Sequence, residues 1–136
     1  MFVLESTYDG AGTVVEVLSL STGEAAAVGE TFKFSSGKLT KASVSDKPAY
    51  IGIQKVVAGA SNNVEAIAVR ADQVWLADYT STASPVVPPA VGATHCIDAD
   101  GLNVDADKTK DTSEVAGRAT IISVDTAKKK CRVKFE

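Results

Sequence analysis

The residues that decide the fold stand near the C-terminal end of the chain: ATIISV at Ala119–Val124 and KCRVKF at Lys130–Phe135. In the second stretch, Cys131, Val133 and Phe135 alternate with basic residues, which is typical of a β-strand with one buried and one solvated face. The first stretch is rich in β-branched residues, which also favours a strand. Because a short polar segment joins the two, the sequence predicts a C-terminal β-hairpin.

The same period of two recurs upstream and indicates further short strands. A two-residue turn at 36–37 (SG) would place Phe34 opposite Leu39 in a second hairpin, and 100–101 (DG) is typical of a type I′ hairpin turn. The candidate strands are Thr13–Leu18, Thr31–Phe34, Lys38–Lys41, Tyr50–Val56, Val64–Val69, Asp72–Ala77, Thr94–Asp98 and Leu102–Val104.

Two segments interrupt this pattern. Ser81–Pro89 contains three prolines, which exclude it from a central strand or a helix interior. We predict an extended surface crossing there, at the boundary between two halves of the barrel. Trp75 and Tyr79 precede it; we expect Trp75 in the core, with a contact to a partner as the alternative. The polar stretch Asp105–Ser113 predicts a mobile loop.

The strand pattern predicts an all-β fold: a small β-barrel or β-sandwich of short antiparallel strands and hairpins, with little helix. The turn signals recur roughly every 8–12 residues, as in such folds. With 136 residues, the chain is long enough for one core. We therefore expect a single β-rich domain over residues 13–136, preceded by an N-terminal arm over residues 1–12.

The N-terminal segment is the candidate partner-binding element. Phe2, Val3 and Leu4 form a small apolar cluster, Tyr8 follows, and glycines at 10 and 12 supply a hinge. A free arm of this kind can add itself to the sheet edge of a partner, which makes Phe2, Val3, Leu4 and Tyr8 candidate contact residues. The same cluster also fits the first strand of the protein's own barrel, and the sequence leaves both interpretations open.

Charge and composition narrow the class of protein. A net charge of −3 argues against a duplex-binding protein, which needs a basic surface to neutralise phosphates. The basic residues at 128–134 are expected to be the solvated face of a last strand at a sheet edge. The start of the chain lacks the pattern of a signal peptide, and no apolar window is long enough to span a bilayer, so we expect synthesis and folding in a cytoplasm and no membrane partner.

The sequence offers no catalytic constellation. His95 and Cys96 are adjacent, so in a strand they would point to opposite faces; we expect a core thiol and a surface or edge imidazole. With Cys131 they fall short of a four-ligand zinc site. The aspartates between 98 and 111 suggest calcium, but Gly101 stands in the wrong place for an EF-hand, so a solvated hairpin tip is expected. We predict a non-enzymatic protein without metal or cofactor.

One stretch resembles the head decoration (capsid cement) proteins of tailed bacteriophages. It comprises GETFKFSSGKLTKA at 29–42 and KPAYI at 47–51, with a weaker likeness continuing over about residues 25–135. The resemblance implies a structural virion protein, made in the host cytoplasm, that docks on the outer surface of an assembled capsid and stabilises contacts between capsomers. It implies the major capsid protein as partner, and relatives act as trimers or monomers, often through an N-terminal arm.

Two other functions remain open from the sequence. The chain could be another phage virion component, such as a head–tail or fibre-base module. It could also be a small-ligand or carbohydrate-binding β-barrel, although aromatic residues make up only 6% of the chain, which is few for a sugar-stacking groove.

Overall fold

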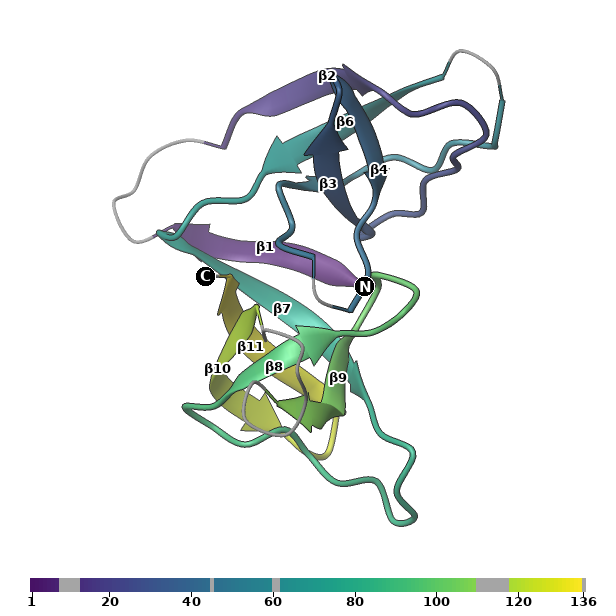
Figure 1. Cartoon of the computed structure of the whole chain (residues 1–136). Helices are drawn as coiled ribbons and strands as arrows, with labels where there is room; N and C mark the ends of the chain where they lie inside the picture. Colours follow the sequence, from purple (N-terminus) through teal and green to yellow (C-terminus); the bar gives the residue numbers. More distant parts are fainter. Residues whose placement is uncertain (8–12, 45, 60–61, 110–117, 136) are drawn as a thin grey trace.

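The computed structural model describes residues 1–7, 13–44, 46–59, 62–109 and 118–135. Its strands form two sheets, one above the other in Figure 1, and the described residues contain no helix. The predicted all-β class is therefore confirmed, with a sandwich-like arrangement of the two sheets.

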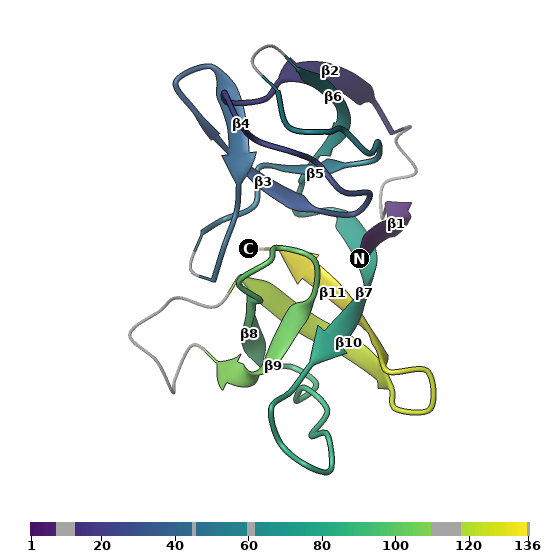
Figure 2. The ribbon, with the colours of Figure 1, turned by 90° about the vertical axis from the view of Figure 1, so that its right-hand side faces the viewer.

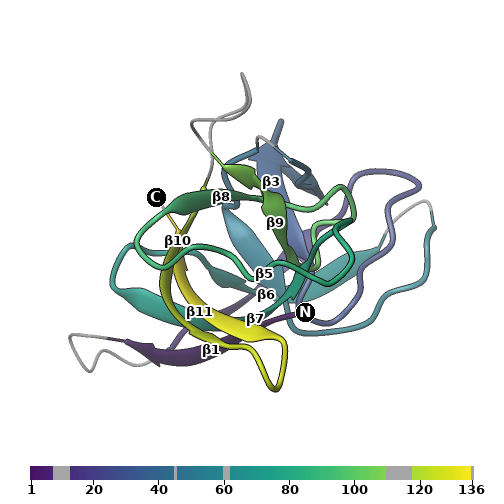
Figure 3. The same ribbon diagram turned by 90° about the horizontal axis from the view of Figure 1, so that it is seen from below.

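The lower sheet in Figure 1 has six strands and curls toward closure. Its order is β1-β7-β11-β10-β8-β9, and the last strand pairs with β7 in parallel at Tyr79 and Thr80. Viewed from below, β1 lies outermost, and β8 and β9 lie on the side of the sheet away from it (Figure 3). Its strands are β1 (Phe2–Thr7), β7 (Gln73–Thr80), β8 (Thr94–Ile97), β9 (Val104–Thr109), β10 (Ala119–Asp125) and β11 (Lys130–Phe135).

The upper sheet is antiparallel, has five strands and is inserted in the chain between β1 and β7. Its order is β2-β6-β5-β3-β4, and β5 ends earlier than predicted because Val56 forms an isolated bridge with Ala26 instead. The prediction that Ser81–Pro89 separates two halves is wrong, since this crossing joins β7 to β8 within one sheet. The strands are β2 (Val15–Ser19), β3 (Thr31–Ser35), β4 (Lys38–Lys41), β5 (Tyr50–Gly52) and β6 (Asn63–Ala68).

Two of the three predicted hairpins, at 36–37 and at the C-terminus, are confirmed. The type I′ turn predicted at 100–101 is wrong, because only Gly101 has a positive φ (69°) and the β8–β9 ladder already ends at the pair Ile97 and Val104. Ser36 and Gly37 have φ values of 51° and 78°, which a type I′ turn requires at both central positions, and Phe34 stands opposite Leu39 as expected. In the C-terminal hairpin, Ala119 pairs with Phe135, and a bulge after Ile121 shifts the later register.

One of the two buried hydrophobic clusters contains residues of both sheets. Trp75 and Phe135 are in edge-to-face contact with ring centroids 6.5 Å apart, and Phe2 lies 5.3 Å from Phe135. Ile51 and Ile67 of the upper sheet belong to the same buried cluster. Trp75 is 1% exposed, so its predicted core position is confirmed. The shared cluster joins the two sheets, and a second cluster, which includes Phe32 and Leu39, belongs to the upper sheet.

The tip of the β8–β9 hairpin also joins the sheets. The carbonyl oxygen of Gly101 accepts hydrogen bonds from the backbone N–H and the hydroxyl of Thr31, each 2.9 Å long, and the Ser43 hydroxyl donates to the Ala99 carbonyl. The predicted solvated tip is therefore wrong at Gly101, which is buried against the upper sheet. The predicted loop at Asp105–Ser113 is also wrong over 105–109, where β9 buries Ala106; residues 110–113 lie outside the described ranges.

Candidate docking surfaces

The described part of the N-terminal segment is a strand of the protein's own sheet. Phe2 is 2% exposed and lies in the core, and Leu4 is partly buried against it. Val3 points the other way and is 44% exposed. Tyr8 lies outside the described residues. Of the candidate contact residues, only Val3 is thus seen at the surface, and Phe2 could meet a partner only if β1 left its sheet.

The outward face of β1, β7 and β11 carries paired charges. The guanidinium of Arg132 donates to both carboxylate oxygens of Glu5, at 2.5 and 2.7 Å, and Lys130 lies 2.7 Å from Asp78. Hydrogen bonding from Arg132 holds the pKa of Glu5 below its usual value. β11 lies between β7 and β10, so the expectation of an edge strand is wrong. Neighbouring acidic residues therefore neutralise much of this basic run.

The Asp78 carboxylate shows how these charges balance. Partial burial raises its pKa, but hydrogen bonds from Lys130 and from the Met1 ammonium outweigh burial, so the pKa is lowered overall. The same ammonium donates to the carbonyl of Leu102 and to Asn103.

The proline-rich crossing is fixed at both ends and exposed between them. At its start, the Asp107 carboxylate accepts hydrogen bonds from the hydroxyls of Ser81 (2.6 Å) and Thr82 (2.8 Å), which lower the pKa of Asp107. Val86 and Val87 then lie on the exposed part, 40% and 52% exposed. In Figure 2 this loop extends below β9 and β10, away from the upper sheet.

His95 fixes the other end of the crossing. Its Nε2 accepts a hydrogen bond from the Ala90 N–H at 3.2 Å, and its Nδ1 is 3.2 Å from the Asp105 carbonyl. These partners fit the neutral tautomer with the proton on Nδ1. His95 is 2% exposed and β8 lies between β10 and β9, so the predicted surface or edge imidazole is wrong. Adjacent residues of β8 do point to opposite faces, but the end of the crossing covers the face that carries His95, so both residues are buried.

The two thiols are structural. Cys96 and Cys131 are buried and not disulfide-bonded, which confirms the core thiol expected at Cys96. Burial raises the pKa of Cys131 to about 12, with the nearby Asp78 carboxylate adding to the effect. A thiol in this environment is protonated at neutral pH and is a poor nucleophile.

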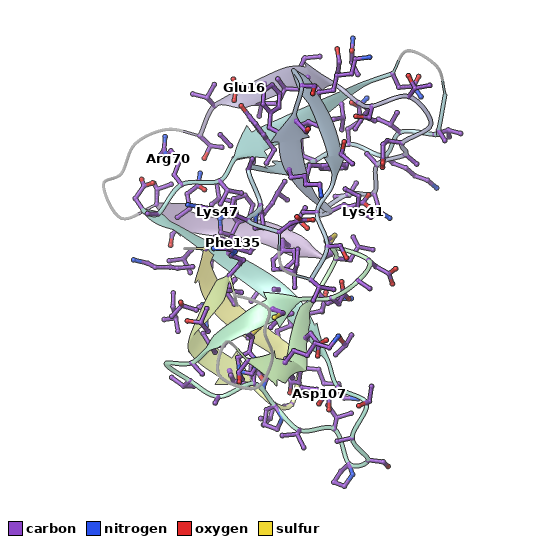
Figure 4. All side chains as sticks on the ribbon, viewed as in Figure 1. Glu16, Lys41, Lys47, Arg70, Asp107 and Phe135 are labelled. Carbon is purple, nitrogen blue, oxygen red and sulfur yellow. The ribbon has the colours of Figure 1, made fainter. Side chains whose placement is uncertain are left out.

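A shallow groove of about 410 Å³ lies on the upper sheet. Phe34, half exposed, and Tyr50 form its aromatic part, with ring centroids 6.1 Å apart. Lys33 is paired with Asp46 at 3.1 Å, whereas Lys47 makes no ion pair with another described residue. Burial and the nearby Glu16 carboxylate raise the pKa of Tyr50. Glu16 and Lys47 are labelled in Figure 4, which draws the side chains of this sheet. This arrangement could accept a ring or an extended apolar segment.

β2 carries the densest run of exposed apolar side chains. Val14, directly before β2, is 66% exposed, and Val15 and Val17 of β2 are 47% and 65% exposed. β2 ends the strand order of the upper sheet and lies at its outer margin in Figure 1. The sequence pattern did not reveal this surface, because an alternating valine strand looks the same whether its apolar face is covered or open. Only the sheet order, which sequence reasoning did not supply, could have revealed it.

Within the described ranges, no group of three or more His, Cys, Asp or Glu side chains is placed to hold a metal ion. Asp98, the first aspartate of the suspected calcium cluster, instead accepts hydrogen bonds from the backbone N–H groups of Leu102 and Asn103. The described part of the chain has no helix that could cross a membrane. Comparison with models of known protein families and with curated proteins finds no match to this chain.

Proposed function

We propose that this protein is a structural component of a phage virion that binds the outer surface of an assembled capsid and stabilises contacts between capsomers. The observation that carries the proposal is the resemblance of residues 29–42 and 47–51 to head decoration proteins. These residues include the whole of β3 and β4 with their turn, and the start of β5. The resemblance thus falls on one continuous piece of the upper sheet rather than on scattered positions.

Physical arguments support the same role. Many weakly binding copies on a symmetric shell gain stability through multivalency and need no active site. The net charge of −3 is compatible with the outside of a shell, away from packaged DNA. Exposed valines on β2 and on the proline-rich crossing offer apolar contact area at two places on the surface.

Binding to heads tests the proposal directly. Undecorated, expanded heads of the phage or prophage that encodes the chain are mixed with the purified protein and sedimented, and the pelleted heads are imaged by electron cryomicroscopy. We expect saturable co-sedimentation and extra density at regular positions on the outer surface. Density only at the portal vertex would favour a head–tail component instead, and no association at all would refute capsid binding.

The N-terminal strand needs its own test within this assay. Deleting residues 1–12 would remove Phe2 from the core, so loss of binding by that variant would also follow from unfolding. Val3→Lys changes an exposed side chain of the same strand and leaves Phe2 in place. If β1 contacts the capsid, Val3→Lys reduces head binding, whereas Val57→Lys, at a 77% exposed loop position, does not. Equal binding by both variants would remove β1 from the contact surface.

The aromatic groove favours a second candidate, a carbohydrate- or small-ligand-binding module. A sugar ring could stack on Phe34 while Lys47 contacts its polar groups. A glycan array gives the test: specific hits that Phe34→Ala abolishes would support this function, while an array without hits would oppose it.

A further inference from the structure

The proline-rich crossing carries an apolar projection that the rest of the described chain leaves uncovered. Residues 82–88 are all exposed, and Val86 and Val87 lie between two exposed prolines. A residue that precedes a proline is restricted to extended conformations, and hydrogen bonds of Asp107 and His95 hold the two ends of the crossing. The projection is therefore ordered before a partner binds, so little conformational entropy is lost on binding.

The aromatic groove of the upper sheet has the shape and chemistry to receive such a segment. Its volume is about 410 Å³, and Phe34 and Tyr50 form its aromatic part, with Phe34 half exposed. Extended segments with two nearby prolines bind in aromatic-lined grooves, because the segment is already stiff and its rings pack on the aromatic faces. The projection and the groove are thus complementary surfaces of the same chain.

The charges beside the two surfaces are also complementary. Lys47 lies at the groove and Asp107 at the base of the crossing, and neither forms an ion pair with another described residue. Hydrogen bonds from the crossing lower the pKa of Asp107, which keeps its carboxylate ionised at neutral pH. Asp107 lies near the lower end of the molecule in Figure 4, with Lys47 well above it, and the crossing extends away from the upper sheet in Figure 2. A chain therefore cannot place its crossing in its own groove.

We propose that the proline-rich crossing of one copy docks in the aromatic groove of a second copy, with Val86 and Val87 against Phe34 and Tyr50. The contact is heterologous, because it joins two different surfaces, and a pair joined by one such contact still has one free groove and one free crossing. The short projection covers much less than the roughly 1,200 Å² of stable complexes, so the association should be weak in solution. This inference goes beyond the proposed function and does not rest on capsid binding.

Sedimentation-velocity ultracentrifugation over about 1 μM to about 1 mM, a range that covers weak association, tests the proposal. We expect reversible self-association of the wild type. Phe34→Lys blocks the groove and Val87→Lys blocks the crossing, so each should raise the dissociation constant by about tenfold or more. Val57→Lys adds the same charge at a 77% exposed position outside both surfaces and should leave the association unchanged. Circular dichroism verifies that the three variants fold.

A mixture of the two blocked variants gives a sharper test. Phe34→Lys retains an intact crossing and Val87→Lys an intact groove, so an equimolar mixture should form a one-to-one heterodimer at concentrations where each variant alone is monomeric. Such recovery requires a contact between two different surfaces. In the wild-type background, Lys47→Glu should weaken the association, whereas Lys129→Glu, the same charge change at an exposed turn position, should not.

The other outcomes overturn the proposal. A wild-type chain that stays monomeric throughout the range refutes the contact, and so does a mixture of the blocked variants that does not associate. Self-association that survives in Phe34→Lys or Val87→Lys places the interface elsewhere. If the wild type is monomeric and both variants lose binding to undecorated heads, the two surfaces contact the capsid instead of a second copy. Self-association that follows these expectations in a chain that does not bind heads would support this inference and refute the proposed function alone.

Discussion

The carboxylate of Glu5 on β1 and the guanidinium of Arg132 on β11 meet across β7, which lies between their strands. Two hydrogen bonds of 2.5 and 2.7 Å join them. Glu5 reaches this position because it stands at the bulge between Leu4 and Ser6, where the register of β1 shifts by one residue. The pair thus ties the N-terminal strand to the C-terminal strand over the face of a third.

The first prediction concerns this pair. A double-mutant cycle with Glu5→Gln and Arg132→Gln should give a small favourable coupling free energy, because both groups are accessible to water. The folded pKa of Glu5 is depressed, so the contribution is fully present above the unfolded pKa of about 4.5 and is lost as the pH falls through the folded pKa. Urea unfolding at pH 7 and pH 3 measures both effects. A coupling energy that does not fall at pH 3 would contradict the ion pair.

The second prediction concerns the hairpin tip that joins the sheets. A Cβ atom on Gly101 would lie 2.6 Å from the Ala42 carbonyl oxygen and 2.8 Å from the Thr31 hydroxyl oxygen, whereas one on Gly37 would meet nothing within 4 Å. Both glycines have positive φ, so each alanine variant loses about 1–2 kcal/mol from backbone strain. Because of overpacking, Gly101→Ala should be less stable than Gly37→Ala by about 1–3 kcal/mol more. Equal losses in urea unfolding would mean that the tip is not docked.

The third prediction concerns His95. His95→Phe fills the site but leaves the Ala90 N–H and the Asp105 carbonyl without their ring partners. Unsatisfied buried groups cost about 1–3 kcal/mol each, so we expect a loss of that order. The proline-rich crossing should also be cleaved faster by proteases under native conditions. His95→Asn retains a donor and an acceptor and should recover part of the lost stability. An unchanged cleavage rate in His95→Phe would show that His95 does not hold the end of the crossing in place.

The fourth prediction concerns Cys131. Its folded pKa of about 12 lies above the unfolded value near 9, so its contribution to stability is complete below pH 9 and declines as the pH rises toward 12. The wild type should lose stability between pH 8 and pH 11 more steeply than Cys131→Ala. At pH 8, Cys131 should resist thiol reagents until denaturant is added. Rapid labelling of Cys131 in the native protein would contradict its burial.

Local patterns in the sequence were sufficient to predict strands and hairpins, but not the contacts between them. The turn at Ser36 and Gly37 and the alternation after Lys130 are decided by neighbours in the chain, and both hairpins are confirmed. The burial of His95 and Gly101 depends on which segment covers each, and that is set by tertiary packing. For the same reason, the sequence left open whether Phe2 lies in the core or contacts a partner, and it could not indicate that Val17 is exposed.

The insertion of the upper sheet between β1 and β7 has a consequence for synthesis on the ribosome. Thr7 pairs with Gln73, so β1 cannot pair with β7 until residues 8–72 have been translated. During that interval all five strands of the upper sheet are complete, while Phe2 and Leu4 still lack their place in the core. Pairing between positions so far apart is slow and leaves apolar surface open in the meantime. The first strand therefore stays without its partner while the five strands of the upper sheet are being made.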